Sequence, residues 1–246
     1  AFKKHRGSNS ANSLVYKFIG FPENDVGVVT IRGSALALDF LIDAQLWSAA
    51  ILIGWVRSLL PLGTWISPLL KYLVKVASIV ESKNLHNVAY YIETSEFLRN
   101  ITAVRRYSRV VVTGHSLGGG IAIISGAQTG TPAIGLSAPN ALISQFTFSP
   151  SVTEENLASY TFNIVPARDI VPTFDDLSTN FQRIRCTSNA NSPAGCHSSS
   201  RSICELLYTC GSHGRPIPCN CVHEFHYEIP KGKEFLAQCP KPNKKR

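Results

Sequence analysis

The sequence predicts an α/β protein in which a central, mostly parallel β-sheet is flanked by helices. Short apolar runs, several of them rich in β-branched residues, are expected to form strands at 26–31, 110–113, 133–137 and 160–165. Segments with helical patterning separate these runs, and strands that alternate with helices are typical of a parallel sheet. The chain has 246 residues, of which 44% are hydrophobic, and it contains no repeat or low-complexity linker. A single domain over residues 1–246 is therefore expected.

The first predicted strand, 26–31, leads into the tripeptide Arg32-Gly33-Ser34. A strongly apolar stretch follows over residues 34–80. Residues 83–106 then carry apolar positions at helical spacing, so an amphipathic helix is predicted directly before the second strand.

Residues 44–70 are the most apolar part of the chain. Arg57 is the only charged residue among them, and they hold all three tryptophans. A membrane-spanning helix needs ~20 apolar residues, but this stretch contains a central arginine, two prolines and two glycines. A spanning helix also could not lie between two strands of one sheet. Buried helices that cover the sheet are therefore expected here, and no membrane span.

Residues 109–125 are the most informative for function. A β-branched run meets the pentapeptide Gly-His-Ser-Leu-Gly at 114–118, and an apolar, helix-like segment follows. This strand–turn–helix context is that of a nucleophile elbow, a turn so tight that the positions two before and two after the serine must be glycine or nearly so. Ser116 is therefore predicted to be a nucleophile. The backbone N–H of Leu117, at the helix start, is predicted to stabilise an oxyanion.

A serine hydroxyl needs a histidine to accept its proton and a carboxylate to orient that histidine. In enzymes with this elbow the chain order is serine, acid, histidine. Asp169 follows an apolar strand and precedes Ile-Val-Pro, so it is predicted to be the acid. Asp175 and Asp176 are adjacent and are expected to lie in a solvated turn.

Four histidines follow Asp169 in the sequence. His197 and His213 lie among cysteines, serines and glycines and are expected in surface loops. His223 and His226 lie just before the final segment, so one of them is predicted to be the base. His223 is chosen here, with His226 as the alternative.

These motifs resemble those of the class 3 lipases, the family of filamentous-fungal triacylglycerol lipases. Four blocks carry the resemblance: Ile-Arg-Gly-Ser at 31–34 with Asp-Phe-Leu-Ile-Asp at 39–43, Gly-His-Ser-Leu-Gly-Gly at 114–119, Gly-Leu-Ser-Ala-Pro at 135–139, and Arg-Asp-Ile-Val-Pro at 168–172. The resemblance implies an α/β-hydrolase fold with Asp169 as the catalytic acid. It also implies that Ser34 is the second oxyanion donor, beside the N–H of Leu117. The family's histidine is followed closely by aromatics, which suits His223.

The same resemblance implies a mobile lid within residues 35–60, because the family's lid begins where Ala35 stands. Tryptophan and arginine together suit the boundary between acyl chains and headgroups. We therefore expect the apolar face of this lid to open onto lipid.

All seven cysteines lie between Cys186 and Cys239, in a cysteine-rich C-terminal insertion that the common family pattern lacks. Such clustering indicates a disulfide framework formed in an oxidising compartment, with one cysteine left over from three pairs. A zinc site built from Cys196, His197, His213 and Cys219 or Cys221 is the alternative, but no CxxC pair supports it. No metal or organic cofactor is expected.

The chain has no methionine and no signal-like N-terminal segment, as expected of a secreted protein after cleavage. We therefore expect a secreted or lumenal protein, where lumenal includes a vacuole- or lysosome-like compartment. Asn100-Ile101-Thr102 is a glycosylation acceptor sequence.

The formal net charge is +8, with basic clusters at 3–6 and 241–246. No nucleic-acid-reading motif accompanies these clusters, so no nucleic-acid partner is expected. The expected partner is lipid at an oil–water or membrane interface, contacted peripherally by a monomer.

The predicted function is ester hydrolysis of tri-, di- or monoacylglycerol through a Ser-Asp-His triad and an acyl-enzyme intermediate. A phospholipase of the same fold is one alternative. A catalytically silent protein that binds a lipid surface is the other.

Overall fold

The computed structural model describes residues 16–33, 47, 90–175, 180–186, 193–230, 235, 238 and 239. The chain divides into two compact units. The sheet unit comprises residues 1–165 and 171–182, and the cysteine-rich unit comprises residues 166–170 and 183–246. The single domain expected over residues 1–246 stays a prediction.

A six-stranded sheet has the strand order β1-β2-β3-β4-β5-β6. The strands are β1 (Tyr16–Phe21), β2 (Val26–Ile31), β3 (Arg109–His115), β4 (Ala133–Leu136), β5 (Thr161–Pro166) and β6 (Phe181–Ile184). β1 pairs antiparallel with β2, whereas the pairs β2–β3, β3–β4 and β4–β5 are parallel. The predicted α/β class with a mostly parallel sheet is confirmed, as are the four predicted strands.

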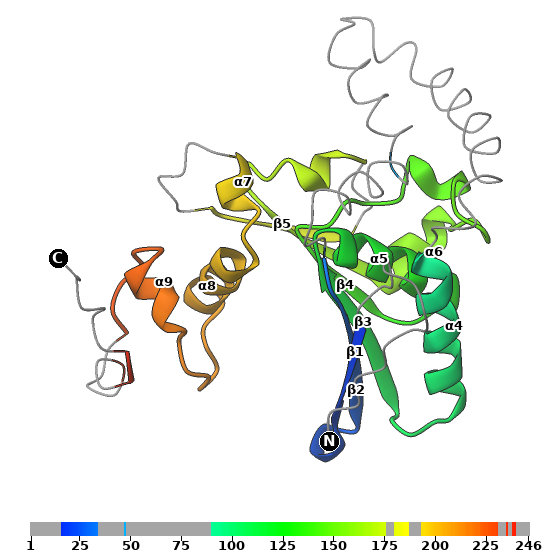
Figure 1. Cartoon of the computed structure of the whole chain (residues 1–246), viewed down its shortest axis with the longest axis horizontal. Helices are drawn as coiled ribbons and strands as arrows, with labels where there is room; N and C mark the ends of the chain where they lie inside the picture. The colour runs from blue at the N-terminus through cyan, green and yellow to red at the C-terminus, as the bar shows by residue number, and fades with distance from the viewer. Residues whose placement is uncertain are drawn as a thin grey trace, which may run out of the picture. The chain divides into compact units, whose positions relative to one another are not determined.

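The sheet unit contains three described α-helices and three short 3-10 helices. They are α4 (Tyr90–Ala103), α5 (Leu117–Thr129), α6 (Glu154–Tyr160), η1 (Pro22–Asn24), η2 (Ser144–Phe146) and η3 (Val171–Thr173). α5 packs against β3 and β4 on one side and against α4 on the other, so it lies between the sheet and α4 (Figure 1). Residues 117–127 of α5 are all buried, which explains why this helix is apolar on every face.

α4 confirms the amphipathic helix predicted within 83–106, and residues 83–89 lie outside the described residues. Its buried side chains are Tyr91, Thr94, Ser95 and Leu98, at the spacing of a single helix face. Burial raises the pKa of the Tyr91 hydroxyl above its usual value, so this group stays protonated near neutral pH. The Tyr91 hydroxyl accepts the backbone N–H of Ser149 at 2.9 Å.

Trp47 is the described residue within the apolar stretch 34–80. Its side chain is buried, its indole Nε1 donates to the carbonyl oxygen of Asn140 at 2.5 Å, and its ring meets Phe148 edge-on. This part of the stretch therefore belongs to the core. Ser34 and, apart from Trp47, the predicted lid at 35–60 lie outside the described residues. Within the described part of the chain, no helix has the length and apolar character needed to cross a membrane.

Asp175 differs from its expected place in a solvated turn, because it is buried. Its carboxylate accepts the backbone N–H of Ile143 at 2.7 Å. It also accepts the N–H of Ser144 at 2.9 Å and the Ser144 hydroxyl at 2.7 Å. These bonds fix the start of η2. The sequence could not predict them, because they join segments that are 31 or 32 residues apart and two adjacent aspartates do not indicate such a contact. Asp176 lies outside the described residues.

Replacing Asp175 by alanine is expected to destabilise the protein by about 2–4 kcal/mol, because two buried backbone N–H groups lose their acceptor. Ser144→Ala is the matched control, which removes one hydroxyl donor and is expected to cost about 1 kcal/mol. The urea midpoints of the two variants measure the difference. Equal midpoints for Asp175→Ala and the unaltered protein would contradict this role.

The cysteine-rich unit contains α7 (Pro193–Cys196), α8 (Ser199–Thr209) and α9 (Cys219–His223). Three disulfides join its cysteines: Cys186–Cys196, Cys204–Cys221 and Cys219–Cys239. Cys210 is exposed and free, so the predicted framework of three pairs with one cysteine left over is confirmed. The cysteines of the alternative zinc site are all held in disulfides, which removes them as metal ligands.

Candidate active site

Ser116 stands at the turn between β3, which ends at His115, and α5, which begins at Leu117. Its backbone has φ 58° and ψ −130°, a conformation that residues with a side chain rarely adopt. Two hydrogen bonds hold it there. Its N–H donates to the carbonyl oxygen of Leu136 at 3.0 Å, and its own carbonyl oxygen accepts the N–H of Gly120 at 3.1 Å. Ser116 is only half-buried, as a nucleophile must be.

The glycines around Ser116 are required by close backbone approach. A Cβ added to Gly114 would lie 2.3 Å from the carbonyl carbon and oxygen of Gly118. A Cβ added to Gly33 would lie 2.5 Å from the carbonyl oxygen of His115 and 3.3 Å from Cβ of Ser116. The backbone at Gly33 is therefore packed directly against the elbow. Ser34, the next residue in the sequence, stays the predicted second oxyanion donor.

Gly114→Ala is expected to destabilise the protein by about 3 kcal/mol or more, because the new methyl group meets rigid backbone at the start of α5. Gly130→Ala is the matched control in the same unit. Gly130 has φ 69°, but a Cβ there would come no closer than 3.5 Å to its nearest neighbour, Tyr160, so only the backbone strain of about 1 kcal/mol is expected. Thermal unfolding of both variants distinguishes the two costs, and equal losses would contradict the close packing at the elbow.

Leu117 is the first residue of α5. The first turn of an α-helix leaves its backbone N–H groups without intrahelical acceptors, and the helix dipole favours negative charge there. This N–H lies directly after the strained serine in the chain. The local fold thus agrees with the predicted role of Leu117 as an oxyanion donor.

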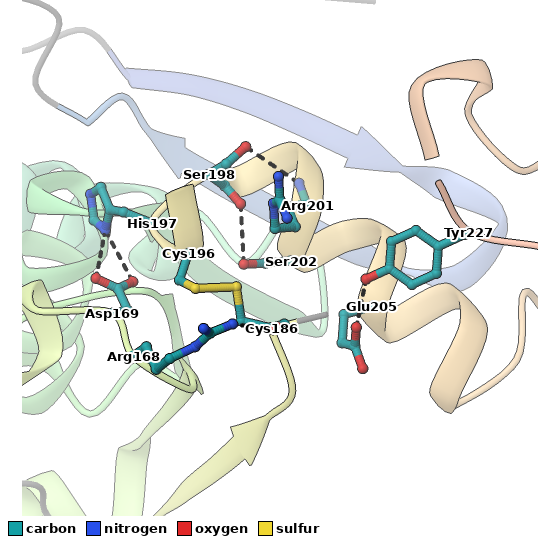
Figure 2. Close-up of a disulfide and its surroundings, with 10 residues drawn as sticks. All are labelled: Arg168, Asp169, Cys186, Cys196, His197, Ser198, Arg201, Ser202, Glu205 and Tyr227. Carbon is teal, nitrogen blue, oxygen red and sulfur yellow. Dashed lines mark hydrogen bonds and ion pairs between the residues drawn. A yellow bond between two sulfur atoms is a disulfide. The ribbon is translucent and has the colours of Figure 1, made fainter. Parts of the chain in front are cut away.

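Asp169 lies in the turn that follows β5, where its N–H donates to the carbonyl oxygen of Pro166 at 3.3 Å. Its side chain is fully buried and faces the imidazole of His197, which is 24% exposed (Figure 2). Nδ1 of His197 lies 3.0 Å from Oδ2 and 3.1 Å from Oδ1 of Asp169. A carboxylate on Nδ1 fixes the tautomer whose Nε2 can accept a proton. Both residues belong to the cysteine-rich unit, whereas Ser116 belongs to the sheet unit.

The sequence profile that describes lipases of class 3 matches residues 28–178. This chain belongs to the class 3 lipase family. The matched span of this lipase runs from β2 through the elbow to just beyond Asp169. It ends before both His197 and His223, so the match does not bear on the choice of histidine.

Solved structures similar to this lipase were found at low sequence identity. A mutant form of MDLA from Penicillium cyclopium has a TM-score of 0.39 at 16% identity, over 76% of this chain and 64% of that chain. The Rhizomucor miehei lipase propeptide complex has a TM-score of 0.37 at 16% identity, over 77% and 58%. Lip2 lipase from Yarrowia lipolytica has a TM-score of 0.39 at 14% identity, over 79% and 68%.

The chain spans about three-fifths of the length of the first two of these structures, 64% and 58%. A direct sequence comparison with curated proteins gave no match.

In this lipase Asp169 faces His197, and not His223, the histidine chosen from the sequence. The choice of His223 as the base is thus without this contact and stays a prediction. Nε2 of His223 lies 3.1 Å from the carbonyl oxygen of Cys239, and its ring lies near Phe235. His197 directly follows Cys196, which is joined to Cys186 by a disulfide. A segment of cysteines, serines and glycines looks like a surface loop in the sequence. The one signal against a surface loop is Cys196, next to His197, because a cysteine in a disulfide framework ties its segment to another part of the chain.

Proposed function

We propose that this class 3 lipase is a serine ester hydrolase in which Ser116, His197 and Asp169 act as the catalytic triad. The observation that carries the proposal is the strained, half-buried Ser116 on its elbow. The contact between the buried Asp169 and the half-buried His197 supports it, because a carboxylate on one imidazole nitrogen prepares the other as a base. β3 and β5 also belong to one sheet of parallel pairs, and reactive groups gather where parallel strands end.

In the proposed reaction, the Ser116 hydroxyl oxygen attacks the ester carbonyl while Nε2 of His197 takes its proton. The carbonyl oxygen becomes an oxyanion, which the N–H of Leu117 and the predicted donor Ser34 stabilise. Collapse of this intermediate breaks the ester bond, and the proton on Nε2 passes to the leaving alcohol. Water then attacks the acyl-enzyme with His197 as base again, which releases the fatty acid and restores Ser116.

Acylglycerols are the proposed substrates. The family supports a lipid ester, and the tryptophan-rich stretch at 44–70 suits contact with an oil–water interface. The net charge of +8 favours the alternative of a phospholipase that selects anionic headgroups. A silent lipid-binding protein would need neither the strain at Ser116 nor a buried carboxylate–imidazole pair.

A substrate panel tests this choice. Emulsions of tri-, di- and monoacylglycerol are compared at one salt concentration with vesicles of zwitterionic and of anionic phospholipid, using Ser116→Ala as the blank. The expected result is faster release of fatty acid from acylglycerols. Faster release from anionic vesicles would favour the phospholipase, and release from none of them would favour the silent binding protein.

A lid within 35–60 is expected to make hydrolysis depend on an interface. Turnover of a short-chain ester should rise sharply once the ester exceeds its aggregation threshold, because the apolar face of the lid then finds lipid. A fully water-miscible ester over the same concentrations serves as the control and should show no jump. A smooth curve for both esters would count against the lid.

We also propose that the protein works in an oxidising compartment, secreted or lumenal, as a monomer. The three disulfides support this location, because reducing compartments rarely preserve such bonds. Asn100, the proposed glycosylation site, is exposed on α4.

A further inference from the structure

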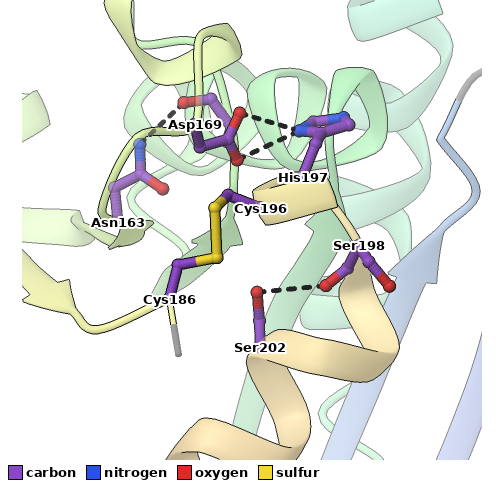
Figure 3. Close-up of polar contacts among 8 residues, drawn as sticks. Asn163, Asp169, Cys186, Cys196, His197, Ser198 and Ser202 are labelled. Atoms are coloured by element: carbon purple, nitrogen blue, oxygen red, sulfur yellow. Dashed lines mark hydrogen bonds and ion pairs between the residues drawn. A yellow bond between two sulfur atoms is a disulfide. The ribbon is translucent and has the colours of Figure 1, made fainter. Parts of the chain in front are cut away.

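The Cys186–Cys196 disulfide lies beside the Asp169–His197 pair (Figure 3) and is linked to it at both ends. Cys196 directly precedes His197 in the chain. At the other end, Nη2 of Arg168 donates to the carbonyl oxygen of Cys186 at 2.8 Å, and Arg168 directly precedes Asp169. The side chains of these five residues and their backbone links thus close a ring that contains one ion pair, one disulfide and one hydrogen bond.

The strand side of this ring is anchored by backbone. The N–H of Ala167 donates to the carbonyl oxygen of Ile184 at 2.8 Å, which ties the end of β6 to the residue just before Arg168. Cys186 follows this anchor closely, so its position relative to Asp169 is fixed. Both sulfurs are buried with their residues, and Cys196 is 1% exposed.

The helix side of the ring is anchored by the start of α8. Ser198 is the N-cap of α8, and its hydroxyl accepts the N–H of Arg201 at 3.4 Å. Ser202 adds a bond from its hydroxyl to the carbonyl oxygen of Ser198 at 3.2 Å (Figure 2). His197 is therefore held between a disulfide cysteine on one side and a helix cap on the other.

We propose that Arg168 and the Cys186–Cys196 disulfide position His197 on Asp169, so that ester hydrolysis requires this one disulfide to be oxidised. The inference rests on the proposed function of His197 as the base. Without the disulfide, the segment that carries His197 loses its covalent link to Cys186. A displacement of about 1 Å in a catalytic group can cost about 10²-fold in rate. A dithiol reductant would therefore inactivate the enzyme. The reductant is oxidised to a cyclic disulfide, and Cys186 and Cys196 are reduced to thiols.

Removal of single disulfides tests the proposal. The variant Cys186→Ala/Cys196→Ala is compared with Cys219→Ala/Cys239→Ala, which removes a disulfide of the same unit that closes a longer loop, with a separation of 20 residues against 10. In the loop-entropy account, the control loses at least as much stability. The first variant is expected to lose about 10²-fold in kcat with KM little changed, whereas the control keeps its kcat.

Arg168 offers a test in which relief of backbone strain offsets the loss of one hydrogen bond. Its backbone has φ 66°, which glycine and asparagine adopt more readily than arginine. Arg168→Gly and Arg168→Asn therefore remove the guanidinium while easing the backbone. Both are expected to lower kcat and leave the thermal midpoint unchanged or higher, and Arg168→Lys, which keeps a donor, is expected to recover part of the rate.

The low-field proton resonance of an imidazole N–H bonded to a carboxylate supplies a readout of position. It should be lost in His197→Ala, weakened in Cys186→Ala/Cys196→Ala and in Arg168→Gly, and kept in the Cys219→Ala/Cys239→Ala control. If the first disulfide variant fails to fold, mild reduction of the folded enzyme replaces it. Alkylation and mass spectrometry then identify which disulfide has opened as activity falls.

The outcomes separate the two proposals. Full activity and an unchanged resonance after loss of Cys186–Cys196, or in Arg168→Gly, would overturn the positioning proposal while His197→Ala stays inactive. Full activity of His197→Ala itself would overturn the proposed function, and the positioning proposal with it. Equal losses of kcat in both disulfide variants would show general destabilisation and would also overturn positioning.

Discussion

Ser116→Ala is expected to lower the rate of ester hydrolysis by about 10⁴–10⁶-fold, because no other group on the elbow can form the acyl-enzyme. The fold should persist, since the backbone of residue 116 can still form its hydrogen bonds to Leu136 and Gly120 in the variant. The kcat for a chromogenic short-chain ester and for an acylglycerol emulsion measures the loss. The thermal midpoint measures the fold.

Ser137→Ala is the matched control for Ser116→Ala. Ser137 follows β4, has φ 53°, and carries a buried hydroxyl that has no hydrogen-bond partner among the described residues. Alanine there keeps the same backbone strain and removes an unsatisfied polar group, so activity and stability should stay close to those of the unaltered protein. A Ser116→Ala enzyme as active as Ser137→Ala would remove Ser116 from the reaction.

His197→Ala is expected to lose about 10⁴–10⁶-fold in kcat, because the Ser116 proton then has no base and Asp169 has no imidazole to orient. His223→Ala is expected to retain nearly full activity. It loses its contact with the carbonyl oxygen of Cys239 and with it about 1 kcal/mol of stability. Steady-state kinetics on one soluble ester compares the two variants directly.

The circular dichroism spectrum and the disulfide content serve as controls for both histidine variants, because both histidines lie in the cysteine-rich unit. His226→Ala completes the series, since His226 was the alternative base. Loss of activity in His223→Ala, with His197→Ala still active, would return the role of base to the residue chosen from the sequence. It would also leave the Asp169–His197 pair without a catalytic role.

The parts of the site that the sequence predicted are those whose signal is local. The strand before Ser116, the glycines beside it and the helix after it all lie within 109–125 and all specify one turn. Asp169 was found for a similar reason, since it directly follows the strand at 160–165. The number of disulfide pairs followed from the cysteine count.

The parts that the sequence did not predict depend on contacts between distant segments. His197 faces Asp169 through a disulfide whose pairing cannot be deduced from spacing. Asp175 is buried because it caps η2, more than 30 residues earlier in the chain, at a separation of 31 from Ser144. β1, an antiparallel edge strand, has the sequence Tyr-Lys-Phe-Ile-Gly-Phe, so its aromatic and apolar residues are a signal that could have predicted it. The short β6, Phe-Gln-Arg-Ile, has no such pattern, so only its place in the sheet reveals it.

Mass-spectrometric mapping of a covalent inhibitor shows directly whether Ser116 is the nucleophile. An organophosphate ester phosphorylates an activated serine, so we expect a single adduct, on the peptide that contains Ser116. Labelling should be slowed severely in His197→Ala and be unaffected in His223→Ala. An inhibited enzyme whose adduct lies on another residue, or an active enzyme that takes up no label, would contradict the assignment of Ser116 as the nucleophile.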